Sequence, residues 1–144
     1  MSTMQELKKI ADLHTCTSAV IVRRGMVLLG LRNYVREKEQ KTISVWTTPG
    51  GRCEAGETIE AGLRRETKEE TGIIDLVIKN FITTVPASNT VKEGDLVHLF
   101  LCTTDEEPEL MEPDKFSEWK WFPADNLPAN FINHHAREFI AALQ

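Results

Sequence analysis

Hydrophobic and polar positions along the chain predict a structure rich in β-strands. The stretch TSAVIVRRGMVLLGLRN (17–33) contains two apolar, β-rich runs on either side of Arg24-Gly25, which indicates a hairpin. Four later stretches also have strand composition: VWTTPGG (45–51), DLVIKNFITTV (75–85), DLVHLFLCTT (95–104) and SEWKWF (117–122). The first of these four is short, because a proline and two glycines end it.

Two stretches have helical spacing. The first runs from Thr58, whose side chain suits an N-cap, to Thr71, and Gly72 is placed to end it. The second is ANFINHHAREFIAALQ (129–144). Five of its side chains are expected to face the core: Phe131, Ile132, Ala136, Phe139 and Ile140. Strands and helices mixed in this order predict an α/β sandwich built on a mixed sheet.

The first helix has an unusual distribution of charge. At about 100° per residue, one side of it carries six residues: Ile59, Gly62, Leu63, Glu66, Glu69 and Glu70. The apolar members of this face must seek the core, so the glutamates that follow are directed at or beside the protein body. They also crowd one another at i, i+3 and i+4, and they lie at the negative end of the helix dipole.

These carboxylates call for a cation. Arg65, four residues before Glu69, can neutralise only part of their charge. An ordinary solvated helix is the alternative, and for most Glu-rich helices it is the better one. Two features argue against a solvated helix. The glutamates fall on the apolar side of the helix, and the pair Gly50-Gly51 before the helix allows close approach of the backbone to a ligand. The pattern therefore indicates a hard divalent ion such as Mg²⁺.

The length and composition of the chain further limit its domain number, location and partners. The chain has 144 residues, so we expect one domain over residues 1–144. No apolar run has membrane-spanning length and the N-terminal stretch has no signal-peptide pattern, so we expect a cytoplasmic protein with no membrane partner. The net charge of -5 argues against nucleic acid as a partner, although a local basic pocket stays open. A homodimer also stays open.

The charged stretch is similar to a known family motif. Gly51, Glu57 and the run RETKEETGI (65–73) resemble the Nudix box, G-x5-E-x7-R-E-U-x-E-E-x-G-U, where U is a bulky aliphatic residue. Every glycine and charged position agrees, and Thr67 at an aliphatic position is the one departure. The sequence is thus identified as a member of the Nudix hydrolases. The resemblance implies the Nudix α/β/α sandwich with a mixed β-sheet.

The resemblance also implies roles for the residues of the box. Glu66, Glu69 and Glu70 would be the principal ligands of Mg²⁺ or Mn²⁺, and the Gly51 carbonyl would complete the metal shell. Glu57 would support the site from the preceding loop. Arg65, implied as a catalytic-site residue, would hold the glutamates in place. The implied reaction is hydrolysis of a nucleoside diphosphate linked to another group X, so the expected partner is a small-molecule nucleotide.

Residues outside the box bear on the identity of X. The stretch EPELMEPDKFSEWKWFPADNLPAN (107–130) resembles MutT-like nucleoside triphosphate pyrophosphatases of the family. In it, Glu112 would be an extra metal ligand or base, or else a surface acid. Asn130 would contact a purine edge, or else cap the closing helix. Trp119 and Trp121 share a strand face and would either stack on a base or pack in the core.

Arg32, at the end of the predicted hairpin, could reach a phosphate of the substrate, although arginines at strand ends are usually only solvated. The best-supported substrate is then a (d)NTP or an oxidised purine (d)NTP, cleaved to the monophosphate and pyrophosphate. Two alternatives remain: an ADP-ribose or nucleotide-sugar pyrophosphatase, and a non-catalytic nucleotide-binding regulatory domain. The complete set of box glutamates speaks against the second alternative.

Overall fold

The computed structural model describes residues 2–88 and 93–143. Its elements, in chain order, are α1 (Thr3–Leu7), β1 (Thr15–Arg23), β2 (Met26–Arg36), the 3-10 helix η1 (Glu37–Glu39), β3 (Lys41–Thr47), β4 (Gly50–Arg52), α2 (Ile59–Thr71), β5 (Val77–Pro86), β6 (Leu96–Thr103), β7 (Phe116–Pro123) and α3 (His134–Ala141). None of the helices within these ranges is long and apolar enough to cross a membrane.

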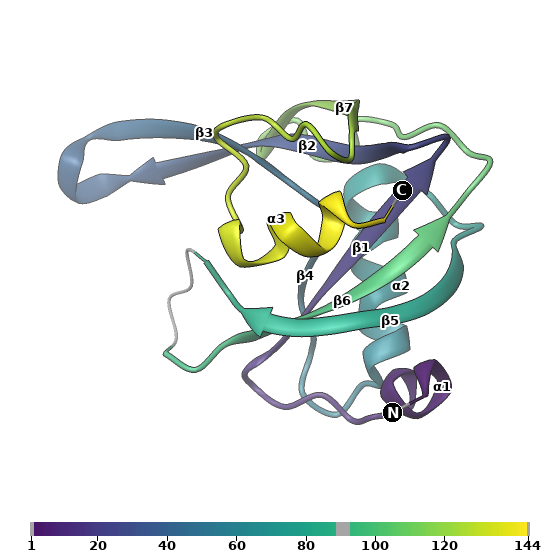
Figure 1. Ribbon diagram of the computed structural model, residues 1–144. Helices are drawn as coiled ribbons and strands as arrows, with labels where there is room; N and C mark the ends of the chain where they lie inside the picture. The colour runs from purple at the N-terminus through teal and green to yellow at the C-terminus, as the bar shows by residue number, and fades with distance from the viewer. Residues whose placement is uncertain (1, 89–92, 144) are drawn as a thin grey trace.

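The strands form one mixed sheet with the order β3-β2-β1-β6-β5, and β4 and β7 attach to it by pairing with β1 and β2. The β1–β6 pair is parallel, whereas the other pairs are antiparallel. Helices α1 and α2 lie on one side of the sheet and α3 lies on the other (Figure 1). The predicted α/β sandwich with a mixed sheet is therefore confirmed.

Each face of the sheet has its own hydrophobic core. Side chains of the central strand β1 alternate between the two cores: Ala19 and Ile21 join the core that contains Leu63 of α2, and Val20 joins the core that contains Ile140 of α3. A strand that is buried on both faces must be apolar at successive positions. This burial explains the continuous apolar run AVIV (19–22) within β1.

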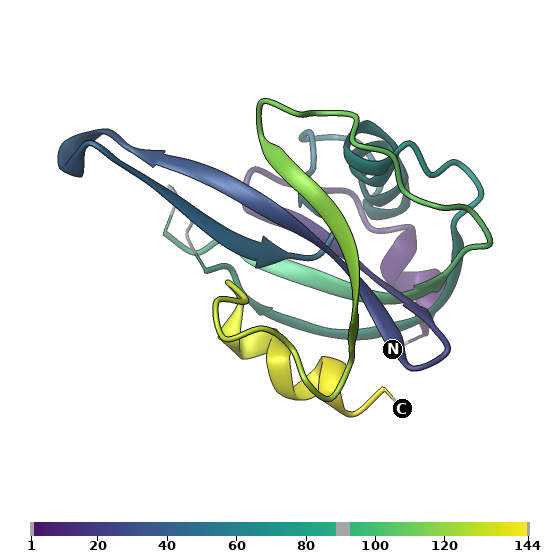
Figure 2. The same cartoon turned by 90° about the horizontal axis from the view of Figure 1, so that it is seen from above.

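The predicted hairpin is present and longer than expected. Its turn lies at Arg24 and Gly25, which have φ angles of 52° and 75°, the left-handed values that a two-residue hairpin turn requires. No strand was predicted for residues 34–44, but β2 continues to Arg36 and pairs with β3 out to Lys41. The outer parts of these two strands project beyond the rest of the molecule (Figure 2).

Helix α2 has the predicted ends. The Thr58 hydroxyl accepts a hydrogen bond from the Ala61 N–H at 3.1 Å, and Gly72 ends the helix with a φ of 77°. Thr67, the departure from the aliphatic motif position, is fully buried, and its hydroxyl donates to the Leu63 carbonyl oxygen at 2.7 Å. The buried hydroxyl is thus satisfied within the helix.

The closing helix differs from its prediction. It covers only His134–Ala141, and its N-cap is Asn133, whose side chain accepts from the Ala136 N–H. Of the two alternatives considered for Asn130, the cap of the closing helix is therefore wrong. Phe139, expected in the core, is 41% exposed, whereas Phe131, Ala136 and Ile140 are buried as predicted. The start of the helix was misplaced because apolar residues also precede it. The helix begins several residues later than the composition indicates, and the apolar residues before it pack from an irregular segment.

The packing around Gly62 of α2 gives a stability prediction. Alanine in a helix interior normally stabilises by about 1 kcal/mol relative to glycine. Here an added Cβ would lie 2.4 Å from the Cys53 sulfur and 2.9 Å from Glu57 Oε1. We expect Gly62→Ala to lower the free energy of unfolding in urea by roughly 1–3 kcal/mol. Adding Cys53→Ala should restore part of the loss, and a Gly62→Ala variant more stable than the parent would contradict this packing.

Candidate functional site

A glycine turn brings the backbone against both β1 and α2. Strand β4 pairs with β1, and Gly50 faces Ser18 in that register. A Cβ on Gly50, whose φ is 144°, would lie 2.1 Å from the Thr17 carbonyl oxygen. A Cβ on Gly51 would lie 2.7 Å from Glu66 Oε2. Only glycine allows this approach, so the turn places Gly51 beside the helix glutamates, as its predicted role requires.

Glu70 is the most deeply buried carboxylate of the box, at 5% exposure. One of its oxygens accepts a hydrogen bond from the Gly50 N–H at 2.9 Å. Burial is the main cause that raises the pKa of Glu70, the neighbouring Glu66 and Glu112 add to the rise, and the Gly50 N–H and Arg32 oppose it, which leaves the pKa at about 8. Without a cation, this carboxyl group resists ionisation.

Arg65 is the centre of an ion-pair network. Its guanidinium lies 2.7 Å from Glu57 Oε1, 3.1 Å from Glu66 Oε1 and 3.3 Å from Glu69 Oε1. The Arg65 hydrogen bond holds the pKa of Glu57 below its usual value, whereas burial raises the pKa of Glu66. Arg65 therefore forms ion pairs with three glutamates of the box.

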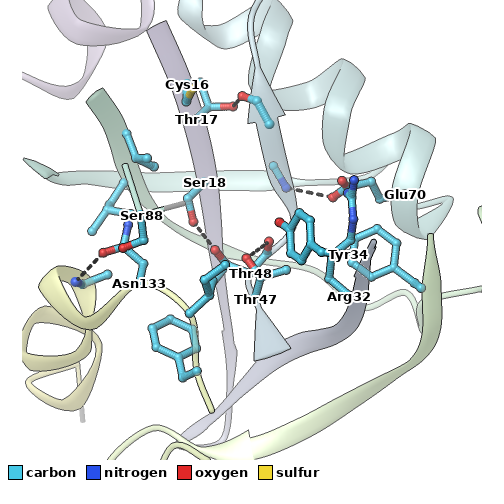
Figure 3. A pocket seen from close by; sticks show the side chains of 18 residues that line it. Cys16, Thr17, Ser18, Arg32, Tyr34, Thr47, Thr48, Glu70, Ser88 and Asn133 are labelled. Carbon is cyan, nitrogen blue, oxygen red and sulfur yellow. Dashed lines mark hydrogen bonds between the residues drawn. The ribbon is translucent and has the colours of Figure 1, made fainter. Parts of the chain in front are cut away.

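Two adjoining hollows open beside these residues. The acidic hollow is lined by Glu66, Glu69, Glu70 and Glu112 together with Gly50, Gly51, Arg32, Tyr34, Cys16, Arg52, Asp95, Ala87 and Lys115. The strand-lined hollow, drawn in Figure 3, combines polar groups with an apolar side that includes Val97, Leu99, Phe116 and Phe131. The structure thus brings Glu112 to the predicted glutamates, while Glu57 faces Arg65 and is not among these lining residues.

The two hollows share a wall made of Cys16, Arg32, Tyr34, Gly50, Gly51 and Glu70. Arg32 stands out in this wall because its Nε atom is buried and, among the described residues, has no hydrogen-bond partner. Its guanidinium carbon lies 4.9 Å from the centre of the Tyr34 ring and 5.3 Å from that of Phe116. These rings orient the cation toward the cleft without neutralising it.

Three predicted substrate residues lie elsewhere. The Asn130 amide donates to the Ser44 carbonyl oxygen at 3.2 Å, beside β3, and Asn130 lines neither hollow. Trp119 and Trp121 pack against the core beneath α2 and also line neither hollow. Because β7 pairs with β2, their shared strand face covers this core. Of the two fates considered for these tryptophans, the structure favours packing in the core.

The cleft contains residues that the sequence analysis missed. Tyr34 follows Arg32 at a spacing of two on β2, so strand alternation could have placed it on the same face. Ser88 and Asn133 line the strand-lined hollow together, although they come from distant parts of the chain (Figure 3). The Ser88 hydroxyl is buried with no partner among the described residues. No local pattern marked either residue.

The donor set of the acidic hollow fits a hard divalent cation. Its carboxylates are Glu66, Glu69, Glu70 and Glu112, and Gly51 also lines it. Within residues 2–88 and 93–143, no three acidic, histidine or cysteine side chains already stand in the arrangement of a metal site. Instead, Arg65 pairs with two of the carboxylates, Glu66 and Glu69. A bound cation would therefore neutralise carboxylate charge that Arg65 now balances.

Comparisons with known proteins agree with this fold. The family described as the NUDIX domain matches residues 12–143. A nudix hydrolase 1 from Caenorhabditis elegans is 33% identical over 74% of the chain, but the chain spans only 28% of its length. An ADP-ribose pyrophosphatase from Methanocaldococcus jannaschii is 29% identical over 69% of the chain, which spans 59% of that protein.

The chain matches a larger share of two further proteins. An oxidized purine nucleoside triphosphate hydrolase from Danio rerio is 30% identical over 78% of the chain, which spans 67% of that protein. The crystal structure of a MutT NUDIX hydrolase from Burkholderia pseudomallei superposes on 93% of the chain and 100% of its own, with a TM-score of 0.71 and 25% identity.

The mixed-sheet α/β/α sandwich, with its box glutamates beside a glycine turn, defines the class of proteins that share the NUDIX domain. The chain belongs to this class, the Nudix family. Hydrolases of the family generally use divalent metal ions.

The burial of Glu70 predicts how the stability of the metal-free protein depends on pH. Its pKa of about 8 in the fold exceeds the ordinary value of 4.5, so the folded state holds a proton that the unfolded state releases. Stability should therefore fall as the pH rises from about 4.5 to about 8. We expect this slope in urea titrations with EDTA present, and Glu70→Gln should flatten it. An unchanged slope in Glu70→Gln would assign the effect to other groups.

Proposed function

We propose that the chain is a Mg²⁺- or Mn²⁺-dependent pyrophosphatase that hydrolyses a (d)NTP or an oxidised purine (d)NTP to the monophosphate and pyrophosphate. The observation that carries this proposal is the shared wall between an acidic hollow and a strand-lined hollow. A nucleoside triphosphate has two corresponding parts, an anionic chain that needs cations and a flat base that needs apolar and polar contacts. Arg32 and Tyr34 stand where the two parts join.

The acidic hollow would receive the phosphates. Glu66, Glu69, Glu70 and the Gly51 carbonyl would hold the divalent metal, which supplies charge neutralisation at the phosphate oxygens. The guanidinium of Arg32, which lines the acidic hollow, would bind a phosphate oxygen, because the Tyr34 ring beside it carries no charge. Binding in this cleft orients the linkage and lowers the barrier through positioning and charge stabilisation.

Hydrolysis also requires that a proton be removed from the attacking water. A P–O bond forms between this water and one phosphorus, the P–O bond of the linkage breaks, and a carboxylate takes the water proton. Glu112 suits this role because it lies on a different segment from the α2 glutamates and its only described ion pair, with Lys115, is long at 3.4 Å. Arg65 keeps its role as a positioning residue.

The strand-lined hollow would receive the nucleoside. Phe116 and Phe131 offer apolar area to a base, and Ser88 and Asn133 offer hydroxyl and amide groups to its edge. The Danio rerio relative is named for oxidised purine nucleoside triphosphates, and this name supports a purine in the hollow. Asn130, with its amide directed to β3, is not needed for base contact.

A second candidate is the hydrolysis of ADP-ribose. The relative from Methanocaldococcus jannaschii is named an ADP-ribose pyrophosphatase, and its similarity to the chain is comparable to that of the Danio rerio protein. ADP-ribose carries the same two parts, with a sugar in place of the terminal phosphate. The chemistry at the box residues would be identical for both substrates. The choice between a nucleoside triphosphate and ADP-ribose therefore depends on whether the cleft accepts a phosphate or a sugar next to the cleaved linkage.

A substrate panel tests the proposal. Purified protein with Mg²⁺ or Mn²⁺ should be incubated with dNTPs, NTPs, 8-oxo-purine triphosphates, ADP-ribose and nucleotide sugars, and products should be identified by chromatography. We expect a purine triphosphate to be the best substrate and pyrophosphate to be the second product. Faster hydrolysis of ADP-ribose would support the second candidate, and the absence of hydrolysis in the whole panel would reject the enzymatic proposal.

The box assignment is tested by Glu69→Gln. Glu69 lines the acidic hollow and its side chain is half exposed, so losing its charge should spare the fold. We expect kcat/KM to fall by about a hundredfold or more with little change in melting temperature. Glu60→Gln is the matched control, because Glu60 lies on the same helix but pairs with Arg64. Near-parental activity of Glu69→Gln at saturating Mg²⁺ would show that the ligand assignment is wrong.

A further inference from the structure

A buried acid on α1 has no part in the proposed site. The side chain of Glu6 is only 2% exposed, and it lines neither the acidic hollow nor the strand-lined hollow. One of its oxygens lies 2.9 Å from His98 Nδ1 on β6, and the other lies 2.9 Å from Lys9 Nζ. His98 Nδ1 also lies 3.2 Å from the Thr84 hydroxyl on β5. The Glu6 carboxylate therefore joins α1 to two strands of the sheet.

This carboxylate sets where α1 sits on the sheet. A buried ion pair adds little net stability, because the cost of removing its charges from water offsets most of their attraction. Its hydrogen bonds nevertheless require a defined geometry, whereas an apolar contact such as that of Leu7 tolerates small shifts. A second bond fixes the start of the helix, since the Phe81 N–H of β5 donates to Thr3 Oγ1 at 2.9 Å. Helix α1 is thus held in one position.

The segment after α1 is hydrogen-bonded to the loop between β4 and α2. The Ala11 N–H donates to the Glu57 carbonyl oxygen at 2.8 Å, and the Gly56 N–H donates to the Ala11 carbonyl oxygen at 3.0 Å. The Ile59 N–H donates to the Lys9 carbonyl oxygen at 2.9 Å. Helix α1 accordingly lies beside the start of α2 (Figure 1). These three bonds hold the loop at Glu57 and on both sides of it.

Glu57 connects this loop to the proposed metal site. Its side chain lies 2.7 Å from the Arg65 guanidinium, which lies 3.1 Å from Glu66 and 3.3 Å from Glu69. Glu66 and Glu69 line the acidic hollow, whereas Glu57 does not. A shift of the loop would move one partner of Arg65 and so change how Arg65 pairs with the other two. A continuous series of contacts therefore leads from Glu6 to carboxylates of the hollow.

We propose that residues 3–11 form a brace in which Glu6 is a positioning residue for the metal site, acting through Glu57 and Arg65. The brace lies outside residues 12–143, which match the NUDIX domain, so the family pattern does not contain it. The inference rests on the proposed function in one respect, the divalent metal at the helix glutamates. It adds that the affinity for this metal depends on a contact outside the box.

General support of the fold is the competing explanation, because Leu7 of α1 is buried in the core beneath α2. If α1 only covers this core, loss of the Glu6 contact lowers stability and leaves the metal site unchanged. If the brace positions Glu57, the same loss weakens metal binding while the protein stays folded. Metal binding and local opening of the folded protein separate the two explanations.

The first test is Glu6→Ala, with Glu6→Gln as the conservative variant that keeps an oxygen acceptor for His98. The dissociation constant for Mn²⁺ should be measured without substrate, from the electron paramagnetic resonance signal of the free ion. We expect it to rise about three- to tenfold in Glu6→Ala, less than the roughly 10- to 100-fold that follows loss of a residue bonded directly to a ligand. Glu6→Gln should lie between Glu6→Ala and the parent.

Hydrogen exchange reports on the brace itself. The amides of Ala11, Gly56 and Ile59 donate the three bonds between the brace and the loop. In Glu6→Ala their exchange, followed by NMR, should be at least about tenfold faster, as expected for local opening of these bonds. Unchanged exchange of these three amides would overturn the proposal.

The matched control is Ile140→Val. Ile140 of α3 is fully buried in the core on the other face of the sheet, so a smaller side chain there lowers stability without touching the brace. Its Mn²⁺ affinity should equal that of the parent. Unchanged affinity in Glu6→Ala, or an equal loss in Ile140→Val, would show that α1 only supports the fold. If Glu6→Ala does not fold, Glu6→Gln is compared with the control in its place.

A double-mutant cycle tests the route through Glu57. Glu57→Gln removes the charge that pairs with Arg65. Adding Glu6→Ala to Glu57→Gln should therefore raise the Mn²⁺ dissociation constant no further. Fully additive effects of the two substitutions would contradict this route.

The outcome for the brace is separable from the outcome for the proposed function, because Mn²⁺ binding needs no substrate. A parent protein that binds Mn²⁺ but hydrolyses nothing in the substrate panel would refute the function, and the variants would still decide the brace. A parent protein that hydrolyses a nucleotide, with equal Mn²⁺ affinity in Glu6→Ala, would refute only the brace. A parent protein that binds no Mn²⁺ would overturn both.

Discussion

The hydrogen bond from the Gly50 N–H to the buried Glu70 carboxylate is the contact on which the rest of the site depends. It joins the glycine turn to the last turns of α2, and it exists only because no Cβ at Gly50 or Gly51 obstructs the approach. The same contact places a carboxyl group where water is largely excluded, which is why its pKa is raised to about 8. Because α2 packs against the core through Leu63, its glutamates line the acidic hollow.

Charge balance in the absence of a metal depends on Arg65. The helix glutamates would otherwise repel one another at the negative end of the α2 dipole. Arg65 binds Glu57, Glu66 and Glu69 simultaneously, and two of these, Glu66 and Glu69, line the acidic hollow. Glu70 is outside this network, because it bonds to the backbone. Arg32 opposes the rise of the Glu70 pKa only in part, since the pKa stays at about 8, which is consistent with an incoming divalent ion.

The loop between β6 and β7 adds the remaining acid from outside the box. It is fixed to the end of α2, since Glu106 accepts hydrogen bonds from the N–H groups of Ile74 and Asp75, and the Glu109 N–H donates to the Thr71 carbonyl at 2.8 Å. Glu112 follows these anchors and reaches the acidic hollow. The same helix thus positions its own glutamates and the loop that completes them.

The sequence alone determined the features that depend on neighbours along the chain: the β1–β2 turn, the ends of α2, and the placement of the box glutamates on one helix face. These follow from strand alternation, capping and helical spacing, which are local. Three features were decided by the tertiary structure. Asn133 rather than Asn130 caps α3, Trp119 and Trp121 pack in the core, and Ser88 and Asn133 both line the strand-lined hollow. These outcomes depend on which strands pair across long separations, and the packing free energy that selects the pairing is a property of the whole sheet.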